Sequence, residues 1–194
     1  MHFRVNTKGI SAEAQQAVVD SIRVVPNFPK PGLFFKDLSL LLGNPAAFGS
    51  TIDALVHKYA GRGITAVVGI ECRGFCFAAP VAIALKVPFV PFRKPGKLPC
   101  KSIGIDFKQS AGKHSAYFGK DRLEMHEDGL TAGSKVLVID DLLGTGSTMF
   151  GACELVEKVG ATVVECACIV EVKELAGRER VKRDIFILIE DAED

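Results

Sequence analysis

The sequence has no excess of charge of either sign, because 24 lysines and arginines are balanced by 23 aspartates and glutamates, for a net charge of +1. Such a chain has no overall attraction for nucleic acid or an anionic membrane, so we expect neither partner, and any basic site must be local. No apolar run approaches the roughly 20 residues of a membrane span, and Met1 to Arg4 lead into no apolar core of a signal peptide. These absences favour a cytoplasmic protein that does not contact membranes.

Zinc-finger spacing between cysteine and histidine is also missing, as are internal repeats, linkers and low-complexity tracts. With 194 residues, 48% of them hydrophobic, we expect residues 1–194 to form a single domain that buries roughly 70% of its unfolded surface. The six cysteines lie largely in apolar segments and are expected to be buried, reduced, intracellular thiols: Cys72, Cys76, Cys100, Cys153, Cys166 and Cys168.

What the sequence does contain is an alternation of helical segments with short apolar runs. Helices are expected over 11–24, 45–61, 75–85 and 149–159, and strands over 64–70, 87–92, 123–126, 136–139, 161–170 and 185–189. This alternation predicts an α/β fold with a mostly parallel central sheet flanked by helices. In such folds ligands bind beyond the carboxyl ends of the strands.

The most informative stretch is 136–148. It begins with an apolar strand, continues with the two acids Asp140 and Asp141, and ends in a loop of glycines and hydroxyls before a helix. Glycines let backbone N–H groups converge on an anion, and a helix N-terminus adds free donors and a favourable dipole. The predicted phosphate-binding residues are Leu143, Gly144, Thr145, Gly146, Ser147 and Thr148.

Two common nucleotide-binding motifs are excluded for this loop. No lysine follows the glycines as in a Walker A loop, and the third spaced glycine of a dinucleotide fingerprint is missing. Acids placed before a phosphate loop can accept hydrogen bonds from the hydroxyls of a phosphate-bearing sugar, so a ribose 5-phosphate site is predicted here. The alternative is an ordinary strand-to-helix turn with an aspartate near the helix cap.

This stretch resembles the phosphoribosyl pyrophosphate motif of type I phosphoribosyltransferases. Residues 27–37, with the pattern Asn-Phe-Pro-x-Pro-Gly-x-x-Phe-x-Asp, are similar to the hood signature of the adenine phosphoribosyltransferase family. The resemblance implies that 24–40 form a small N-terminal hood over the purine, with Phe35 stacked on adenine and the backbone of Phe34 facing its exocyclic amine. The implied adenine-binding residues are Leu33, Phe34, Phe35 and Lys36, the last at a position where the family commonly has arginine. Taken without the resemblance, the aromatic pair is equally compatible with the protein core.

Two further polar segments follow predicted strands. Residues 71–75, Glu-Cys-Arg-Gly-Phe, resemble the family's pyrophosphate loop, in which a serine usually stands in place of Cys72. Residues 93–99, Arg-Lys-Pro-Gly-Lys-Leu-Pro, match the family's basic loop, whose cations suit a diphosphate. The implied pyrophosphate-binding residues are Glu71, Cys72, Arg73, Arg93, Lys94 and Lys97. The alternatives are a simple salt bridge of Arg73 and a solvated loop at 93–99.

Residues 100–116 show no convincing periodicity, and we expect a mobile lid loop there, because a reaction through a cation-like sugar needs water to be excluded. In the family a shorter loop ends in Glu-Tyr-Gly-Lys, whereas here residues 117–120 are Tyr-Phe-Gly-Lys. Tyr117 therefore replaces an acid proposed to act near the leaving base. Its phenol is expected to donate a hydrogen bond or to cover the departing diphosphate.

The resemblance implies a purine salvage enzyme that transfers ribose 5-phosphate from phosphoribosyl pyrophosphate to adenine, giving AMP and pyrophosphate. The catalytic residues would be Asp140, Asp141, Arg93 and Tyr117, Mg²⁺ would be held mainly by substrate and water, and the enzyme would be a homodimer. One alternative is a nucleotide-binding regulator of the same fold with weak or no activity, favoured by the departures at Lys36, Cys72 and Tyr117. The other is a hypoxanthine-guanine phosphoribosyltransferase.

Overall fold

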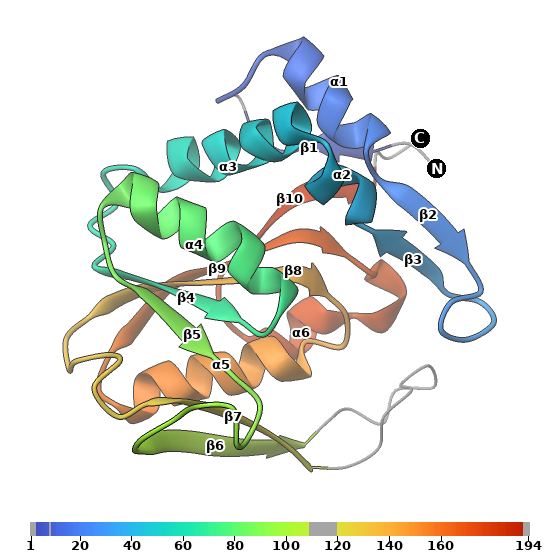
Figure 1. The fold of residues 1–194 in the computed structure, drawn as a ribbon. Coiled ribbons are helices and arrows are strands. Elements are labelled where there is room, and N and C mark those ends of the chain that lie inside the picture. Colours follow the sequence, from blue (N-terminus) through green and yellow to red (C-terminus); the bar gives the residue numbers. More distant parts are fainter. Residues whose placement is uncertain (1–2, 8, 109–119, 192–194) are drawn as a thin grey trace.

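The computed structural model describes residues 3–7, 9–108 and 120–191, and a six-stranded sheet forms its centre (Figure 1). Five of these strands are parallel, and β1 pairs antiparallel with β10 at one edge. The spatial order is β1 (Phe3–Val5), β10 (Ile185–Asp191), β9 (Thr162–Glu171), β8 (Lys135–Leu143), β4 (Ala66–Ile70) and β5 (Phe89–Phe92). A mostly parallel sheet of this kind confirms the predicted α/β class.

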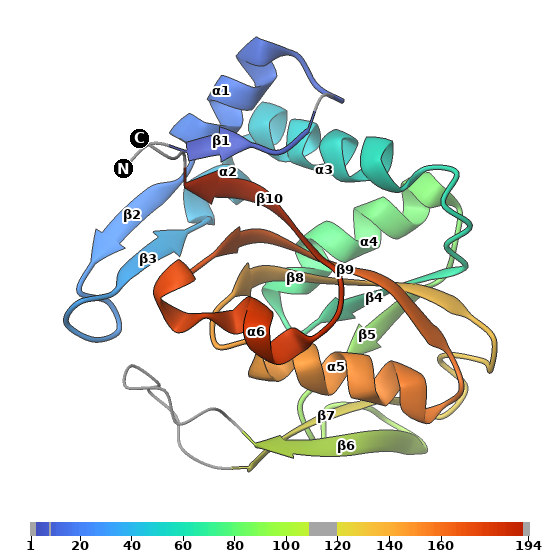
Figure 2. The ribbon, with the colours of Figure 1, turned by 180° about the vertical axis from the view of Figure 1, so that it is seen from behind.

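Different elements cover the two faces of the sheet. On one face, α4 (Arg73–Leu85) packs on β4 and β8, and α3 (Pro45–Tyr59), α1 (Ala12–Asp20) and α2 (Ser39–Gly43) extend this layer. The opposite face carries α5 (Ser147–Lys158), with η1 (Lys173–Leu175) and α6 (Gly177–Val181) nearby (Figure 2). Beneath α5, β6 (Ser102–Lys108) and β7 (Lys120–His126) form an antiparallel hairpin.

Successive side chains of the central strand β8 point to opposite faces of the sheet and pack into two separate core clusters. Val136 and Val138 belong to the cluster under α5, whereas Leu137 and Ile139 belong to the cluster under α1, α3 and α4. All four side chains are fully buried, which explains why this strand is continuously apolar rather than alternating. Packing on both faces fixes the end of β8, where Asp140 and Asp141 follow.

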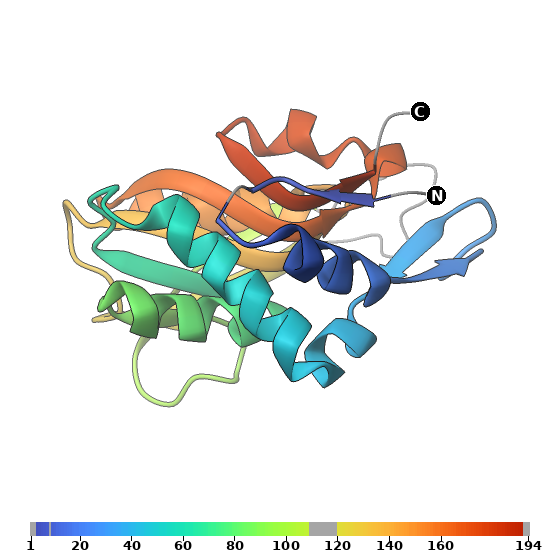
Figure 3. The same ribbon diagram turned by 90° about the horizontal axis from the view of Figure 1, so that it is seen from above.

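The hood is a second, smaller sheet. β2 (Arg23–Pro26) and β3 (Phe34–Asp37) pair antiparallel and project beyond the end of the central sheet (Figure 3). In the loop between β2 and β3, the side-chain oxygen of Asn27 accepts a hydrogen bond from the backbone amide of Gly32 at 3.0 Å. Gly32 has a φ of 86°, a left-handed conformation that favours glycine. Neither strand of the hood is among the strands expected from the sequence, and β3 forms because β2 supplies a pairing partner.

Several other boundaries differ from the expectation. The first helix ends at Asp20 rather than residue 24, because 23–26 pair in the hood hairpin, and β1 was not predicted. Residues 102–108 are the strand β6 rather than part of an irregular loop. The lid positions 109–116 and Tyr117 lie outside the described residues, so their predicted roles remain predictions.

The cysteine expectation is half wrong. All six cysteines are free, but Cys72, Cys76 and Cys100 are exposed, and only the other three are buried. The exposed thiols of Cys72 and Cys76 lie at the start of α4, and that of Cys100 lies before β6. In the described part of the chain, no helix is both long enough and apolar enough to span a bilayer.

Candidate active site

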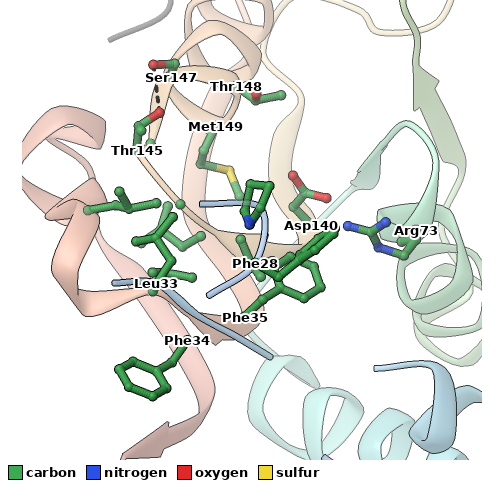
Figure 4. Close-up of a pocket in the computed structure, with 17 residues that line it drawn as sticks. Phe28, Leu33, Phe34, Phe35, Arg73, Asp140, Thr145, Ser147, Thr148 and Met149 are labelled. Atoms are coloured by element: carbon green, nitrogen blue, oxygen red, sulfur yellow. Dashed lines mark hydrogen bonds between the residues drawn. The ribbon is translucent and has the colours of Figure 1, made fainter. Parts of the chain in front are cut away.

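One cavity of about 410 Å³ opens between the hood and the carboxyl ends of β8 and β9 (Figure 4). Its wall combines three parts of the chain that are distant in sequence: the hood, the end of β8 with the loop into α5, and the segment after β9. The lining residues are Phe28, Pro29, Leu33, Phe34, Phe35, Arg73, Asp140, Leu142, Leu143, Gly144, Thr145, Gly146, Ser147, Thr148, Met149, Val172 and Leu175.

All six residues predicted to bind phosphate line this cavity. Gly146 is the N-cap of α5, with a φ of 75°, and no side chain caps the first turn of the helix. The first amides of α5 therefore remain available as donors for an anion, in line with the helix dipole. The hydroxyls of Thr145 and Ser147 lie 3.1 Å apart and are hydrogen-bonded, so the loop presents both backbone and hydroxyl donors.

The two acids differ in their surroundings. Asp140 lines the cavity, whereas Asp141 is 6% exposed and accepts a hydrogen bond from the Arg73 guanidinium. The amide of Asp141 also donates to the Asp140 carboxylate at 2.9 Å. Burial, and then the neighbouring charge of Asp141, raise the pKa of Asp140 well above its ordinary value. The ionised form of Asp140 would therefore be stabilised by a hydroxyl donor or a positive charge beside it.

The predicted pyrophosphate residues form a cluster at the ends of β4 and β5. The Glu71 carboxylate accepts hydrogen bonds from the Lys97 ammonium at 2.5 Å, the Lys94 amide at 2.9 Å and the Arg93 guanidinium at 3.2 Å. Burial by itself would raise the pKa of Glu71, but the bonds from Lys97 and the Lys94 amide lower it overall. Glu71 therefore acts as a counter-ion that organises the basic loop.

Of this pyrophosphate set, Arg73 alone lines the cavity. Cys72 is exposed at the N-cap of α4, and the Lys94 ammonium pairs with the carboxylate of Asp121. The turn and the basic loop thus lie together through Glu71, and only Arg73 of this set reaches the cavity.

The hood places aromatic rings over the cavity. Phe28 and Phe35 pack edge to face with their centroids 5.2 Å apart, and the Phe34 ring points away from them (Figure 4). Phe28 and Phe34 are 50% and 42% exposed, so both rings present apolar surface that is available to a flat ligand.

Lys36 is the exception among the predicted adenine-binding residues. It does not line the cavity, its side chain is 3% exposed, and its ammonium is paired with Asp191. Adjacent residues of a strand point to opposite sides, so the side chain beside Phe35 faces the protein interior. The Lys36 side chain therefore points away from the cavity, and adenine binding by residue 36 remains a prediction.

Some lining residues were not predicted. Phe28 and Pro29 belong to the hood signature and were identifiable from it, but Met149, Val172 and Leu175 carry no chemical signal in the sequence. Val172 reaches the cavity because its amide donates to the Leu143 carbonyl at 2.9 Å, which ties the end of β9 to the phosphate loop.

Comparison with known proteins agrees with this geometry. The phosphoribosyl transferase domain model matches residues 46–192. Adenine phosphoribosyltransferase 1 of Triticum aestivum is 43% identical over 176 residues, which cover 90% of this chain and 93% of that protein. The adenine phosphoribosyltransferase of Roseiflexus castenholzii is 48% identical over 169 residues, or 87% of this chain and 94% of that protein. The chain belongs to the adenine phosphoribosyltransferase family.

A solved structure of the family has the same fold as this phosphoribosyltransferase. The adenine phosphoribosyltransferase of Saccharomyces cerevisiae, complexed with D-2,5-dideoxy-2,5-imino-altritol 1,6-bisphosphate and adenine, superposes with a TM-score of 0.81 at 34% sequence identity. The match covers 92% of this chain and 99% of that chain. The shared architecture therefore extends over most of the chain.

Proposed function

We propose that this phosphoribosyltransferase transfers ribose 5-phosphate from phosphoribosyl pyrophosphate to adenine, with AMP and pyrophosphate as products. The observation that carries the proposal is a single cavity whose wall joins an aromatic hood, the carboxylate of Asp140 and a glycine-hydroxyl phosphate loop. A purine nucleoside monophosphate needs these three environments, in this order, for its base, its ribose and its phosphate.

The phosphate loop at 143–148 would hold the 5-phosphate through the first amides of α5 and the nearby hydroxyls. Asp140 would accept hydrogen bonds from the ribose hydroxyls. As the bond between the anomeric carbon and the pyrophosphate oxygen breaks, the sugar becomes cationic, and the two acids would stabilise that charge. Asp141, next to Asp140 in the sequence, is oriented by its hydrogen bond from Arg73.

The pyrophosphate would leave toward the cations beside the cavity. Arg73 faces the cavity, and Arg93, Lys94 and Lys97 lie next to it, with Cys72 at the intervening turn. Glu71 keeps this loop in place when no anion is bound. Charge-assisted hydrogen bonds from these groups would bind the substrate diphosphate and stabilise it as it departs.

Adenine would bind under Leu33, Phe34 and Phe35, with the Phe35 ring stacked on the base. Its ring nitrogen forms the new bond to the anomeric carbon, and its N–H proton is released to water or phosphate. A backbone carbonyl of the hood accepts from the 6-amino group, whereas a 6-oxo purine would place an acceptor against it. Tyr117 would donate a hydrogen bond or cover the departing diphosphate.

Magnesium fits this site as a cofactor held mainly by substrate. The Asp140 carboxylate would supply the hard oxygen donor that Mg²⁺ prefers, with substrate and water as the remaining ligands. When bound, Mg²⁺ would neutralise charge on the diphosphate.

A homodimer in the cytoplasm is part of the same proposal. Free thiols at all six cysteines suit a reducing compartment, and the dimer is implied by the family resemblance. Light scattering after gel filtration would test the dimer.

A coupled assay of nucleotide formation with adenine, hypoxanthine and guanine tests the function. We expect efficient AMP formation and discrimination of 6-oxo purines by about a hundredfold or more. Equal efficiency on the three bases would overturn the adenine assignment. Binding of phosphoribosyl pyrophosphate without any nucleotide formed would support the regulator instead.

A further inference from the structure

The hood and the phosphate loop are attached to consecutive residues at the end of β9. The Lys36 ammonium, on β3, donates to the carbonyl of Glu171 at 2.8 Å. The amide of the next residue, Val172, donates to the carbonyl of Leu143 at the start of the phosphate loop, at 2.9 Å. One short segment therefore fixes the base side and the phosphate side of the cavity relative to each other.

Lys36 is buried far more deeply than lysines usually are. Its side chain is 3% exposed and pairs with the Asp191 carboxylate at 2.9 Å, while the ammonium lies 5.4 Å from the centroid of the Phe3 ring. Burying an ammonium is costly unless it is paired and hydrogen-bonded. Here the single cation ties the hood hairpin to the ends of β9 and β10 and to β1.

The segment that receives Lys36 is itself held rigidly. The Glu171 carboxylate accepts two hydrogen bonds from Arg178, at 2.8 and 2.9 Å, and Arg178 also donates to Glu190 at 2.7 Å. Just before Arg178, Gly177 packs against the phosphate loop so closely that an added Cβ would lie 2.2 Å from the carbonyl oxygen of Gly144. Small movements of this segment would therefore reach the phosphate loop.

We propose that Lys36 is a positioning residue that sets the span between the purine hood and the phosphate loop. The proposal rests on the proposed function for the identity of the ligand, but its test measures binding alone. A ligand that bridges both sides of the cavity requires the correct span, whereas a ligand that uses only the phosphate side does not. AMP is the bridging ligand, and ribose 5-phosphate is the matched ligand without a base.

The experiment compares the dissociation constants of AMP and ribose 5-phosphate by calorimetry for wild type and Lys36→Met. Methionine retains the apolar stem, and the Asp191 carboxylate, 23% exposed, can be hydrated when the cation is gone. We expect AMP to bind about tenfold more weakly, the effect of about one charged hydrogen bond, with ribose 5-phosphate within about twofold of wild type. Lys36→Arg should restore AMP binding, because it keeps a cation that can reach the same acceptors.

Arg23→Gln is the matched control. Arg23 lies on the same hairpin, but its 52% exposed side chain pairs with Asp37 inside that hairpin, so its loss should leave both dissociation constants within about twofold. Equal weakening of AMP and ribose 5-phosphate in Lys36→Met would indicate general damage and overturn the inference, as would unchanged AMP binding.

If Lys36→Met does not fold, Asp191→Asn tests the same attachment from β10 and should weaken AMP selectively, by a smaller factor; no selective loss there would overturn the inference. Failure of the wild type to form AMP from adenine would reject the proposed function, yet the binding comparison would still decide the role of Lys36.

Discussion

Arg73 and Asp141 form a direct ion pair across 68 residues of sequence, with the Arg73 guanidinium donating to the Asp141 carboxylate. Burial alone would lower the pKa of Arg73, but the hydrogen bond and charge of Asp141 raise it overall. One residue belongs to the turn predicted to bind pyrophosphate and the other to the acid pair predicted to bind ribose. The two predicted subsites are therefore physically connected before any ligand arrives.

This connection predicts non-additive mutants. Arg73→Met and Asp141→Asn should each lower kcat/KM for phosphoribosyl pyrophosphate, and the double mutant should lose less than the sum by about 0.5–3 kcal/mol. Arg62→Gln provides a control, because Arg62 pairs with Glu165, away from the cavity, and should be additive with Arg73→Met. If the effects of Arg73→Met and Asp141→Asn add to within about 0.5 kcal/mol, the ion pair does not couple the two subsites.

Asp140→Asn should make the protein more stable and less active. The folded-state pKa of Asp140 is raised by burial and by Asp141, so its stabilising, protonated form is fully present at low pH and is lost as the pH rises through the folded pKa. In wild type the Tm should therefore fall over that range, and Asp140→Asn should not show this fall.

At neutral pH we expect the Tm of Asp140→Asn to exceed that of wild type by about 2–4 °C, which corresponds to roughly 1 kcal/mol for a chain of this size. Its turnover should be on the order of a hundredfold lower, because charge stabilisation of the sugar is lost. Asp141→Asn should instead lower the Tm, since it removes the partner of Arg73. Calorimetric unfolding across pH and a steady-state assay measure both effects; a less stable Asp140→Asn would contradict the assignment.

The elements that could be predicted from the sequence are those marked by a pattern within a short run of residues. The apolar run at 136–139 predicted a strand, and the acids and glycines after it predicted the loop that lines the cavity. The strand β6 was missed although Ile103, Ile105 and Phe107 alternate with other residues, because its glycine and charged residues obscured the period.

Other features depend on contacts that no local pattern contains. β1 is three residues long and forms only by pairing with β10, at the other end of the chain. Lys36 adjoins Phe35 in the hood signature, so the family resemblance includes it among the adenine-binding residues. Once β3 is known to be a strand, its alternation turns Lys36 inward, toward Glu171 and Asp191.

Tyr117 should support catalysis without acting as a base. A phenol with an ordinary pKa near 10 cannot serve as the base that a glutamate would be at neutral pH, and the purine N–H proton can leave to water or phosphate. We expect measurable activity in wild type, a modest loss of kcat in Tyr117→Phe, and a larger loss in Tyr117→Ala. Steady-state assays with adenine and Mg²⁺ measure this order, and an inactive Tyr117→Phe would indicate an essential proton transfer by the phenol.

The phosphate loop offers a test in which two neighbouring glycines should respond differently. Gly146 has a φ of 75°, and an added Cβ would lie 2.3 Å from the Gly177 carbonyl oxygen, so alanine there is both strained and in collision with the backbone. At Gly144 an added Cβ would meet only the Leu175 and Leu142 side chains, at 3.5 and 3.7 Å, and the backbone is not left-handed. Gly146→Ala should therefore displace the loop, while Gly144→Ala should be tolerated.

We expect Gly146→Ala to weaken ribose 5-phosphate binding by at least about tenfold, because the amides at the start of α5 lose their alignment, and to lower the free energy of unfolding by about 1–3 kcal/mol. Gly144→Ala should change the dissociation constant by less than about threefold and the unfolding free energy by less than about 1 kcal/mol. Calorimetry and urea unfolding on both variants measure the contrast. Equal effects at the two positions would mean that the left-handed turn at Gly146 does not shape the phosphate site.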